Sequence, residues 1–377
     1  AIQYCLESAG LGRNDIDYLA HSFSYEPFRS MYEESESDFT RRQFAEVYSR
    51  TAQLQCLDGH LPGVDWNRKL VQVPHHLAHA ASAFYATDFE ESLILVADGM
   101  GELDSTTIAV GQRTGIKIVK RIRALHSLGI LYSVFTLYLG FHPNLDEYKL
   151  MGLAPYGDPR RYFNGVMGCI HLKGDGSYVI PLLFRNDTPE EKQTYAGTVR
   201  ELVDRFGPPR EPEEKITQRH MDIAAALQAA LQASLLHILR HFKKETGQDN
   251  LCMAGGVALN CTANGVIKRS GMFRRMFVQP AAGDDGSALG AALYIQRAQE
   301  PDAPRKRMAA PLWGPGYEND AIGRSLSRRK ECESIFFASS DDLVGNVAQR
   351  LGRGEIVGWF QGRMEFGPRA LGNRSIL

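Results

Sequence analysis

The sequence predicts an α/β fold, because strand-like and helix-like segments alternate along the chain without internal repeats. Residues 216–244 place apolar side chains at helical spacing, which predicts a long helix packed against a sheet. Short apolar runs with the length of buried strands lie on both sides of this helix, mostly bounded by glycine-containing turns: 93–97, 106–110, 116–121 and 276–278, together with a strand that opens the segment 250–260 before its glycine turn.

The other elements are predicted from composition and turn residues. Residues 1–90 are expected to be helical and loop-rich, ending in a helix that runs to about Tyr85. A short helix is expected over 131–139. Residues 157–215 are polar and rich in proline and glycine, which predicts an insertion with a small hairpin near 178–183.

Composition limits the class of protein. The 377 residues are 44% hydrophobic and 23% charged, and the net charge of -1 gives no electrostatic footprint for nucleic acid. The six cysteines form no C-x-x-C pair, which favours a reducing compartment over a disulfide framework. No apolar run approaches the roughly 18 residues of a membrane helix, and no signal peptide opens the chain. We therefore expect a cytoplasmic protein without membrane or nucleic-acid partners.

The length and the two ends suggest how the chain is organised. At 377 residues the chain exceeds the usual size of one domain, so two domains or a duplicated architecture are expected. The chain begins without methionine, inside an amphipathic pattern, and stops on apolar residues. We therefore expect truncation at both ends.

Two histidines and a carboxylate suggest a metal site. His75 and His79 are four residues apart in a predicted helix that follows a proline, so their side chains lie on one helical face. Asp98 stands at the end of an apolar strand. Structural histidines are common on helices, and from spacing alone both interpretations remain open. His76 points about 100° away from His75, so we expect a structural or supporting role for it.

Glycines follow two of the predicted strands. Gly99 and Gly101 come after Asp98, where their backbone could approach a phosphate closely. Gly255 and Gly256 lie where a strand leads into a helix, and a helix N-terminus favours an anion. The alternative is a tight turn without a ligand. The sequence matches neither G-x-x-x-x-G-K-[ST] nor G-x-G-x-x-G, which disfavours a P-loop or a dinucleotide fold.

Asp284 and Asp285 stand at the start of a predicted small-residue helix. They could simply cap that helix, each contributing about 1 kcal/mol or less. Alternatively, one of them completes a metal set with His75, His79 and Asp98. Two nitrogen and two oxygen ligands suit Fe²⁺, Mn²⁺ or Zn²⁺.

Two further segments carry charge among glycines. Lys149 lies in the segment 147–157 and could contact a phosphate or a ribose, although an ordinary surface lysine is the default interpretation. The segment 361–374 holds three arginines and one glutamate. Guanidinium groups recognise carboxylate and phosphate in a bidentate manner, but a salt-bridged domain junction is an equal alternative.

Together these stretches resemble the O-carbamoyltransferase family, which includes the nodulation and antibiotic-tailoring carbamoyltransferases. The matching segments span residues 75 to 377 in the family's order: HHLAHAASAF, ADGMGE, EYKLMGLAPYG, AGGVALN, GDDGSALGAAL and GRMEFGPRALGNRSIL. Each motif alone is weak, but their combination and order are specific. The family's main domain is similar to the tRNA threonylcarbamoyl-transfer protein.

The resemblance implies a set of site residues. The expected metal is divalent, with Fe²⁺ first and Mn²⁺ or Zn²⁺ as alternatives. The ligands that the resemblance implies are His75, His79, Asp98 and Asp284, with Asp284 preferred over Asp285 by alignment. For the nucleotide, it implies a phosphate hairpin at Gly99 and Gly101 and a nucleoside pocket at Gly255, Gly256, Val257 and Asn260. Weaker nucleotide candidates are Lys149 and Gly152. No general base can be named from the sequence.

The resemblance also implies a fold and a domain organisation. It implies the actin-like ATPase superfold, in which nucleotide and metal lie between two α/β lobes. Residues 1–350 would form this carbamoyl-transfer domain, including the insertion at 157–215. Residues 351–377 would begin a C-terminal YrdC-like domain that is otherwise missing, and the opening β-hairpin of the family is also missing. The fragment could therefore bind nucleotide and metal without being active.

The reaction implied is ATP-dependent O-carbamoyl transfer. Carbamoyl phosphate and ATP would give a carbamoyl-adenylate, whose carbamoyl group would pass to a hydroxyl of a small-molecule acceptor. The acceptor is open, and so is the oligomeric state, a homodimer included. Alternatives are a tRNA threonylcarbamoyl-type transferase, a metal-dependent hydrolase and a non-catalytic nucleotide-binding module. The near-neutral charge disfavours RNA, and the absence of H-E-x-x-H disfavours the hydrolase.

Overall fold

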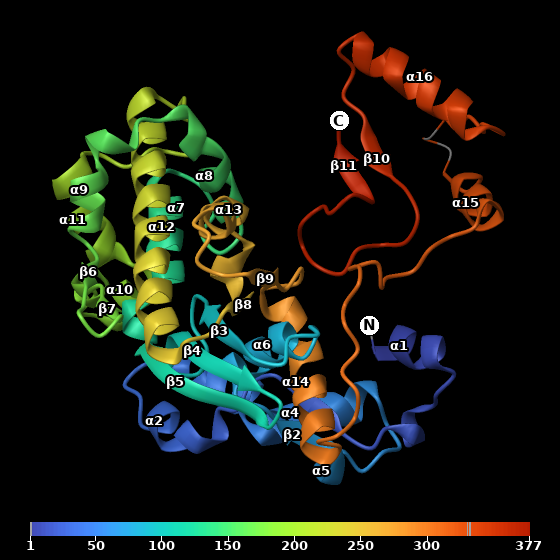
Figure 1. The fold of residues 1–377 in the computed structure, drawn as a ribbon, viewed down its shortest axis with the longest axis horizontal. Coiled ribbons are helices and arrows are strands. Elements are labelled where there is room, and N and C mark those ends of the chain that lie inside the picture. The colour runs from blue at the N-terminus through green and yellow to red at the C-terminus, as the bar shows by residue number, and fades with distance from the viewer. Residues whose placement is uncertain (1, 330, 332) are drawn as a thin grey trace. The chain divides into compact units, whose positions relative to one another are not determined.

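The computed structural model describes residues 2–329, 331 and 333–377. The chain divides into two compact units, Ala1–Arg307 and Met308–Leu377. The first unit contains the large sheet and the helices that cover it (Figure 1). The second unit is small and is described separately below.

A five-stranded mixed sheet organises the first unit. Its strand order is β5-β4-β3-β8-β9, and β3 pairs antiparallel with β4 but parallel with β8. The bounds agree closely with the predicted runs: β3 Ser92–Ala97, β4 Asp104–Gln112, β5 Gly115–Arg123, β8 Asn250–Ala254 and β9 Arg275–Val278. All six residues of the central strand β3 are buried, because helices cover both faces.

Alternate residues of β3 belong to two different cores. Leu93 and Leu95 pack in a large cluster with the apolar face of α12 (Gln218–Thr246) and with α7 (Leu128–Tyr138). Ile94 and Val96 pack in a second cluster on the other face, with the end of α6 (His75–Phe84). The helix α14 (Asp284–Gln299) lies against α6 on that side (Figure 1). The mixed α/β class is therefore confirmed.

The long helix α12 is a core helix. By length and composition it could cross a membrane, but 72% of its most apolar 18-residue window is buried inside the protein. Its buried side chains include Ile223, Leu227 and Leu235, at the helical spacing that the sequence predicted.

The segment 157–215, predicted as a polar insertion, contributes apolar side chains to the main core. Val166, Tyr178, Leu202 and Phe206 are buried in the same core cluster as α12 and the sheet. The predicted hairpin exists, but it is short and is followed by a 3₁₀ turn. The bounds of the segment's helices and strands are α9 Phe163–Met167, β6 His171–Leu172, β7 Tyr178–Val179, α10 Pro189–Thr194 and α11 Ala196–Phe206.

The N-terminal region consists of short helices and a small sheet. β1 (Leu19–His21) pairs parallel with β2 (Leu70–Gln72), which leads directly into α6. The helices are α1 Ile2–Ala9, α2 Arg29–Glu33, α3 Asp38–Gln43, α4 Arg50–His60 and α5 Trp66–Lys69. The described residues therefore hold one five-stranded sheet and three two-stranded sheets.

The second unit contains α15 (Asn319–Leu326), α16 (Ser340–Gly352) and an antiparallel pair of strands. β10 (Gly358–Phe360) pairs with β11 (Arg374–Ile376). The predicted domain boundary at residue 350 falls inside α16, whereas the division between the compact units follows Arg307.

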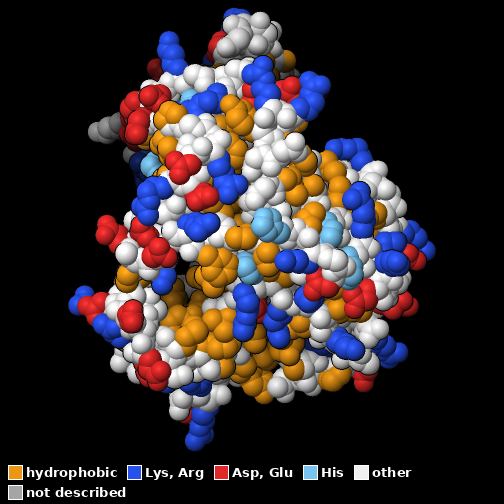
Figure 2. Space-filling view, turned by 90° about the vertical axis from the view of Figure 1, so that its left-hand side faces the viewer, with side chains coloured by type: hydrophobic (Ala, Val, Ile, Leu, Met, Phe, Trp, Pro, Cys, Tyr) orange, Lys and Arg blue, Asp and Glu red, His pale blue; other side chains and the backbone are white. Residues whose placement is uncertain are grey.

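The charge distribution agrees with the near-neutral net charge. Figure 2 shows acidic and basic side chains interspersed over the face that it draws, with hydrophobic side chains gathered in its lower part. That face carries no extended region of a single sign.

Candidate metal centre

Four side chains from three parts of the chain converge beside the end of β3. α6 supplies His75 and His79, Asp98 follows β3, and Asp284 is the first residue of α14. The Nε2 atoms of the two histidines are 3.0 Å apart. Asp98 Oδ2 lies 3.2 Å from His75 Nε2, and Asp284 Oδ1 lies 3.3 Å from the same atom. One ligand atom of each residue lies within 4.8 Å of all the others.

The surroundings of His75 decide which ring nitrogen faces the cluster. Its Nδ1 lies 3.1 Å from the carbonyl oxygen of Ser22, which can only accept, so Nδ1 carries the hydrogen. Nε2 is then the atom that faces the carboxylates, where it can bind either a proton or a metal cation. The ring also stacks on Phe23, with centroids 3.9 Å apart. The segment that follows β1 therefore orients a ligand carried by α6.

Glu102 caps the helix that carries both histidines. Its Oε1 accepts hydrogen bonds from the backbone N–H of His75 at 2.9 Å and of Ser24 at 2.7 Å. The N-cap residue Pro74 makes no side-chain cap, so Glu102 supplies the acceptor at the positive end of the helix dipole. Glu102 thereby joins α6, the segment after β1 and the loop after β3.

The carboxylate of Asp98 is held by the glycine turn after β8. Its Oδ1 accepts a hydrogen bond from the backbone N–H of Gly256 at 2.8 Å, which leaves Oδ2 facing the histidines. A Cβ atom at Gly256 would lie 3.0 Å from that Oδ1. The N–H of Gly256 is thus used to orient a metal ligand.

Burial and charge set the protonation of the cluster. Both histidines are fully buried. Burial lowers the pKa of His75, but hydrogen bonds to Asp284 and Asp98 outweigh it and raise that pKa to about 10. Although burial opposes it, hydrogen bonding to the two histidines holds the pKa of Asp98 well below its usual range. The cluster therefore retains anionic carboxylates around a position that attracts a cation.

The two neighbouring aspartates differ in role. Asp284 faces the histidines, whose hydrogen bonds lower its pKa to about 2. Asp285 contacts neither histidine in an ion pair, and burial, with Asp284 beside it, raises its pKa. The geometry therefore favours Asp284 over Asp285 as the fourth ligand, as the alignment predicted.

The donor set fits a divalent metal. The two histidine Nε2 atoms lie 3.0 Å from each other and 3.2 to 3.6 Å from the carboxylate oxygens of Asp98 and Asp284. With metal–ligand distances of about 2.1 Å, tetrahedral ligands are about 3.4 Å apart and adjacent octahedral ligands about 3.0 Å. Imidazole and carboxylate together suit Fe²⁺, Mn²⁺ or Zn²⁺.

His76 supports the cluster without joining it. Its Nδ1 lies 2.8 Å from Thr107 Oγ1, and burial lowers its pKa to about 3, so the ring is neutral. A Cβ atom at Gly101 would lie 2.9 Å from the His76 ring and 3.3 Å from that of His75. Gly101 therefore lets the loop cover both rings, and its N–H already donates to the carbonyl oxygen of Asp104.

The residues predicted for the nucleoside pocket have packing roles. Gly255 has φ of +89°, and a Cβ atom there would lie 2.3 Å from the carbonyl oxygen of Ala97. The Asn260 amide exchanges two hydrogen bonds with that of Gln228, at 2.9 and 3.0 Å. Val257 is half-buried against the main core. A nucleotide contact by these residues stays a prediction.

The other residues predicted to contact the nucleotide, Lys149, Gly99 and Gly152, differ in whether a neighbouring side chain already occupies them. Lys149 pairs with Asp146 at 2.9 Å. Gly99 and Gly152 both face open space, since no atom lies within 4 Å of the Cβ position of either. These two glycines could therefore accept a close ligand.

The arginine-rich loop of the second unit is held by internal contacts. Arg374 pairs with Glu365 at 3.1 Å, and Arg363 Nε donates to the carbonyl oxygen of Gly314 at 2.9 Å. Glu365 also accepts from the backbone N–H of Leu371 and Asn373. For Arg363 and Arg374, these contacts favour a structural, salt-bridged role over the binding of a carboxylate or phosphate ligand.

Several supporting residues were not predicted. Ser22, Phe23 and Thr107 carry no sequence signal that links them to the histidines, because tertiary contacts alone bring them there. Glu102 lies four residues after Asp98, but only the fold shows that it caps α6.

Comparison with known proteins identifies the class to which this mixed α/β fold and its buried cluster belong. A family model described as the carbamoyltransferase N-terminus matches residues 1–293, and one described as the carbamoyltransferase C-terminus matches residues 348–377. The chain therefore belongs to the carbamoyltransferase family.

Individual relatives agree with this assignment. The chain is 40% identical to the nodulation protein NolNO of Sinorhizobium fredii, matching all of this chain and 53% of that protein. It is 38% identical to the uncharacterized protein sll1178 of Synechocystis, over all of this chain and 63% of that protein. It is 29% identical to the 3'-hydroxymethylcephem-O-carbamoyltransferase of Amycolatopsis lactamdurans, over 78% of this chain and 54% of that protein. The chain spans less than two thirds of the length of these relatives.

Among solved structures, full-length HypF in its phosphate- and nucleotide-bound form matches 79% of this chain and 49% of its own, with a TM-score of 0.40 and 14% identity. T. kodakarensis HypF matches 66% of this chain and 39% of its own, with a TM-score of 0.35 and 17% identity.

Proposed function

We propose that this chain is the transfer part of an ATP-dependent O-carbamoyltransferase. In this proposal, carbamoyl phosphate, water and ATP give a carbamoyl-adenylate, phosphate and pyrophosphate, and the carbamoyl group then passes to a hydroxyl of a small-molecule acceptor. The observation that carries the proposal is the convergence of His75, His79, Asp98 and Asp284 in a chain of the carbamoyltransferase family. A relative named as an O-carbamoyltransferase supports a hydroxyl as the acceptor group.

The chain's own residues would hold a divalent metal and the reacting group. A metal bound by the four residues would act as a Lewis acid that polarises the carbamoyl carbonyl. The side chains of His75 and His79 are fully buried and that of Asp98 is 11% exposed, whereas that of Asp284 is 63% exposed. Substrate would therefore approach from the side of Asp284. Gly99 and Gly152 offer open backbone for the adenylate.

The transfer step balances without a further reactant. The acceptor oxygen bonds to the carbamoyl carbon, and the bond between that carbon and the adenylate phosphate oxygen breaks. AMP leaves with the electron pair, and the acceptor's proton goes to a base that we do not assign. The anionic leaving group needs hydrogen-bond donors close by, and backbone N–H groups at helix N-termini are suited to this.

The proposal extends to the fold and to the partner domain. We infer the actin-like arrangement, with the five-stranded sheet as one lobe and the region around β1 and β2 as part of the other. The residues from 351 onward would begin the YrdC-like domain that makes the carbamoyl-adenylate.

The proposal is tested on the natural polypeptide that contains this chain. Labelled carbamoyl phosphate, ATP and a panel of acceptors (an oligosaccharide, an aminoglycoside and a hydroxymethyl cephem) are combined, and AMP release and labelled product are measured. We expect AMP release that requires carbamoyl phosphate and product with at least one acceptor.

Two adjacent substitutions supply the matched comparison. Asp284→Asn removes a metal ligand and is expected to lower transfer by at least about tenfold, whereas Asp285→Asn leaves the cluster intact. Equal rates in the two variants, or AMP release without carbamoyl phosphate, would contradict the proposal.

A further inference from the structure

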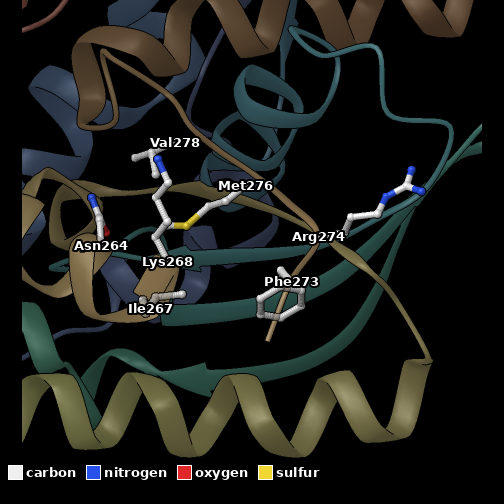
Figure 3. A pocket seen from close by; sticks show the side chains of 8 residues that line it. Asn264, Ile267, Lys268, Phe273, Arg274, Met276 and Val278 are labelled. Atoms are coloured by element: carbon white, nitrogen blue, oxygen red, sulfur yellow. The ribbon is translucent and has the colours of Figure 1, made fainter. Parts of the chain in front are cut away.

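Two pockets of the first unit are lined by none of the four cluster residues. One lies between α13 (Cys261–Arg269) and β9, has a volume of about 260 Å³, and is walled largely by the apolar side chains Ile267, Phe273, Met276 and Val278 (Figure 3). The other, of about 250 Å³, lies where the C-terminal part of α14 and the segment 300–306 meet the residue after α6. Its lining contains three cationic residues, Arg297, Arg305 and Lys306, and one acidic residue, Glu300.

Arg305 is held in this second pocket with one donor unused. Its guanidinium lies 4.7 Å from the centre of the Phe84 ring, and its Nη2 donates to the carbonyl oxygen of Phe89. Its Nη1 is buried and has no hydrogen-bond partner among the described residues. A buried guanidinium nitrogen without an acceptor is unfavourable, because its hydration is lost and nothing replaces it.

Arg305 forms no direct ion pair among the described residues, although Asp88 acts on its charge from a longer distance. In the part of the chain that the structure describes, no carboxylate lies within ion-pair distance of Arg297, Arg305 or Lys306, and Glu300 pairs with no cation. Burial lowers the pKa of Arg305, and Arg297 lowers it further.

Arg275 and Tyr85 lie close to Arg305 and differ in whether they have a polar partner. Arg275, whose guanidinium lies over the Phe89 ring, does have a carboxylate partner, Asp88, so pairing is available nearby. Tyr85 lines the pocket with its ring under the guanidinium of Arg297, and no hydrogen bond of its hydroxyl is found in the described residues. The pocket therefore presents unused donors together with an excess of positive charge.

We propose that this pocket binds a small oxyanion carrying a phosphate group, through Arg297, Arg305 and the Tyr85 hydroxyl. Guanidinium groups match the oxygen geometry of phosphate and bind it by paired, charge-assisted hydrogen bonds. The volume of about 250 Å³ is below the ~300–1,000 Å³ of pockets for drug-sized ligands, which favours phosphate or a short phosphate monoester over a nucleotide. This site does not depend on the proposed transferase activity.

The test is calorimetric titration of the metal-free chain with inorganic phosphate at constant ionic strength, with acetate as the comparison anion. Glycerol phosphate as a second titrant distinguishes free phosphate from a phosphate monoester. Arg305→Gln removes the guanidinium group, and Tyr85→Phe keeps the buried ring and removes only the hydroxyl. Arg307→Gln is the matched control, because Arg307 is an exposed arginine outside the pocket.

We expect saturable phosphate binding, weakened at least about tenfold in Arg305→Gln and several-fold in Tyr85→Phe, and unchanged in Arg307→Gln. The Tyr85→Phe variant keeps the test valid if Arg305→Gln folds poorly. No saturable binding in the wild type would overturn the inference. Equal affinity in all three variants would also overturn it. Binding that survives Arg305→Gln but is lost in Asp98→Asn would place the phosphate at the four-residue cluster instead, and would overturn it as well.

Discussion

Glu102 provides the sharpest test of how the protein positions its histidines. The Glu102→Ala change leaves the backbone N–H groups of His75 and Ser24 without their acceptor. An unsatisfied buried donor costs about 1–3 kcal/mol, and losing a charge at the helix N-terminus costs about 0.3–1 kcal/mol more. Because Glu102 is only half-buried and water can replace part of the loss, we expect a total destabilisation of about 2–4 kcal/mol.

The matched variant Glu102→Gln separates the hydrogen bonds from the charge. Its amide oxygen can still accept from both N–H groups, so we expect a loss of only about 1 kcal/mol. Urea denaturation of the metal-free protein measures the free energy of unfolding of both variants, and a metal titration measures the effect on the cluster. Equal stability of Glu102→Ala and Glu102→Gln would refute the capping role, and unchanged metal affinity in Glu102→Ala would refute the positioning role.

Four further predictions concern the cluster. His79→Ala should abolish metal binding while the alanine-rich helix still folds, and full metal occupancy measured by elemental analysis would contradict this. Metal affinity should rise with pH from 5 to 8, because the metal displaces the proton that His75, with its pKa raised to about 10, binds in the metal-free protein; a flat profile would contradict it. Because the pKa of His75 is raised in the folded protein, its pairing with Asp98 and Asp284 stabilises the metal-free protein fully below about pH 6.5. This stabilisation is lost as the pH rises towards 10. Gly256→Val should displace Asp98 and thereby weaken the binding of metal and ATP. Gly99→Ala places its methyl group in open space and should leave metal binding unchanged. Equal metal affinities of the two variants would contradict the role of Gly256.

The sequence predicted the strands well because hydrophobic runs and turn residues are local signals. β3 to β5 and β8 to β9 lie within a few residues of the predicted ranges, and α12 begins two residues later than expected. The segment 157–215 was predicted to be a polar insertion, and its contribution to the core was not foreseen. Its overall composition is polar, but several of its apolar residues, such as Tyr178 and Phe206, are buried in the main core, which composition does not reveal.

The candidate metal centre was also predicted only in part from local sequence signals. Helical spacing and the family resemblance together predicted the four cluster residues. The roles of Gly101 and Gly256 were harder to predict, because a glycine turn has the same sequence whether its N–H meets a ligand or a neighbouring group. Here these N–H groups meet Asp104 and Asp98 respectively, which tertiary contacts decide.

The measurement that tests the central claim most directly is X-ray absorption spectroscopy of the metal-loaded protein, with the metal content determined on the same sample. The account predicts about one metal ion per chain, with two imidazole nitrogens from His75 and His79 and carboxylate oxygens from Asp98 and Asp284 among its ligands. A metal ion without imidazole scattering, or a protein that binds no divalent metal, would contradict it.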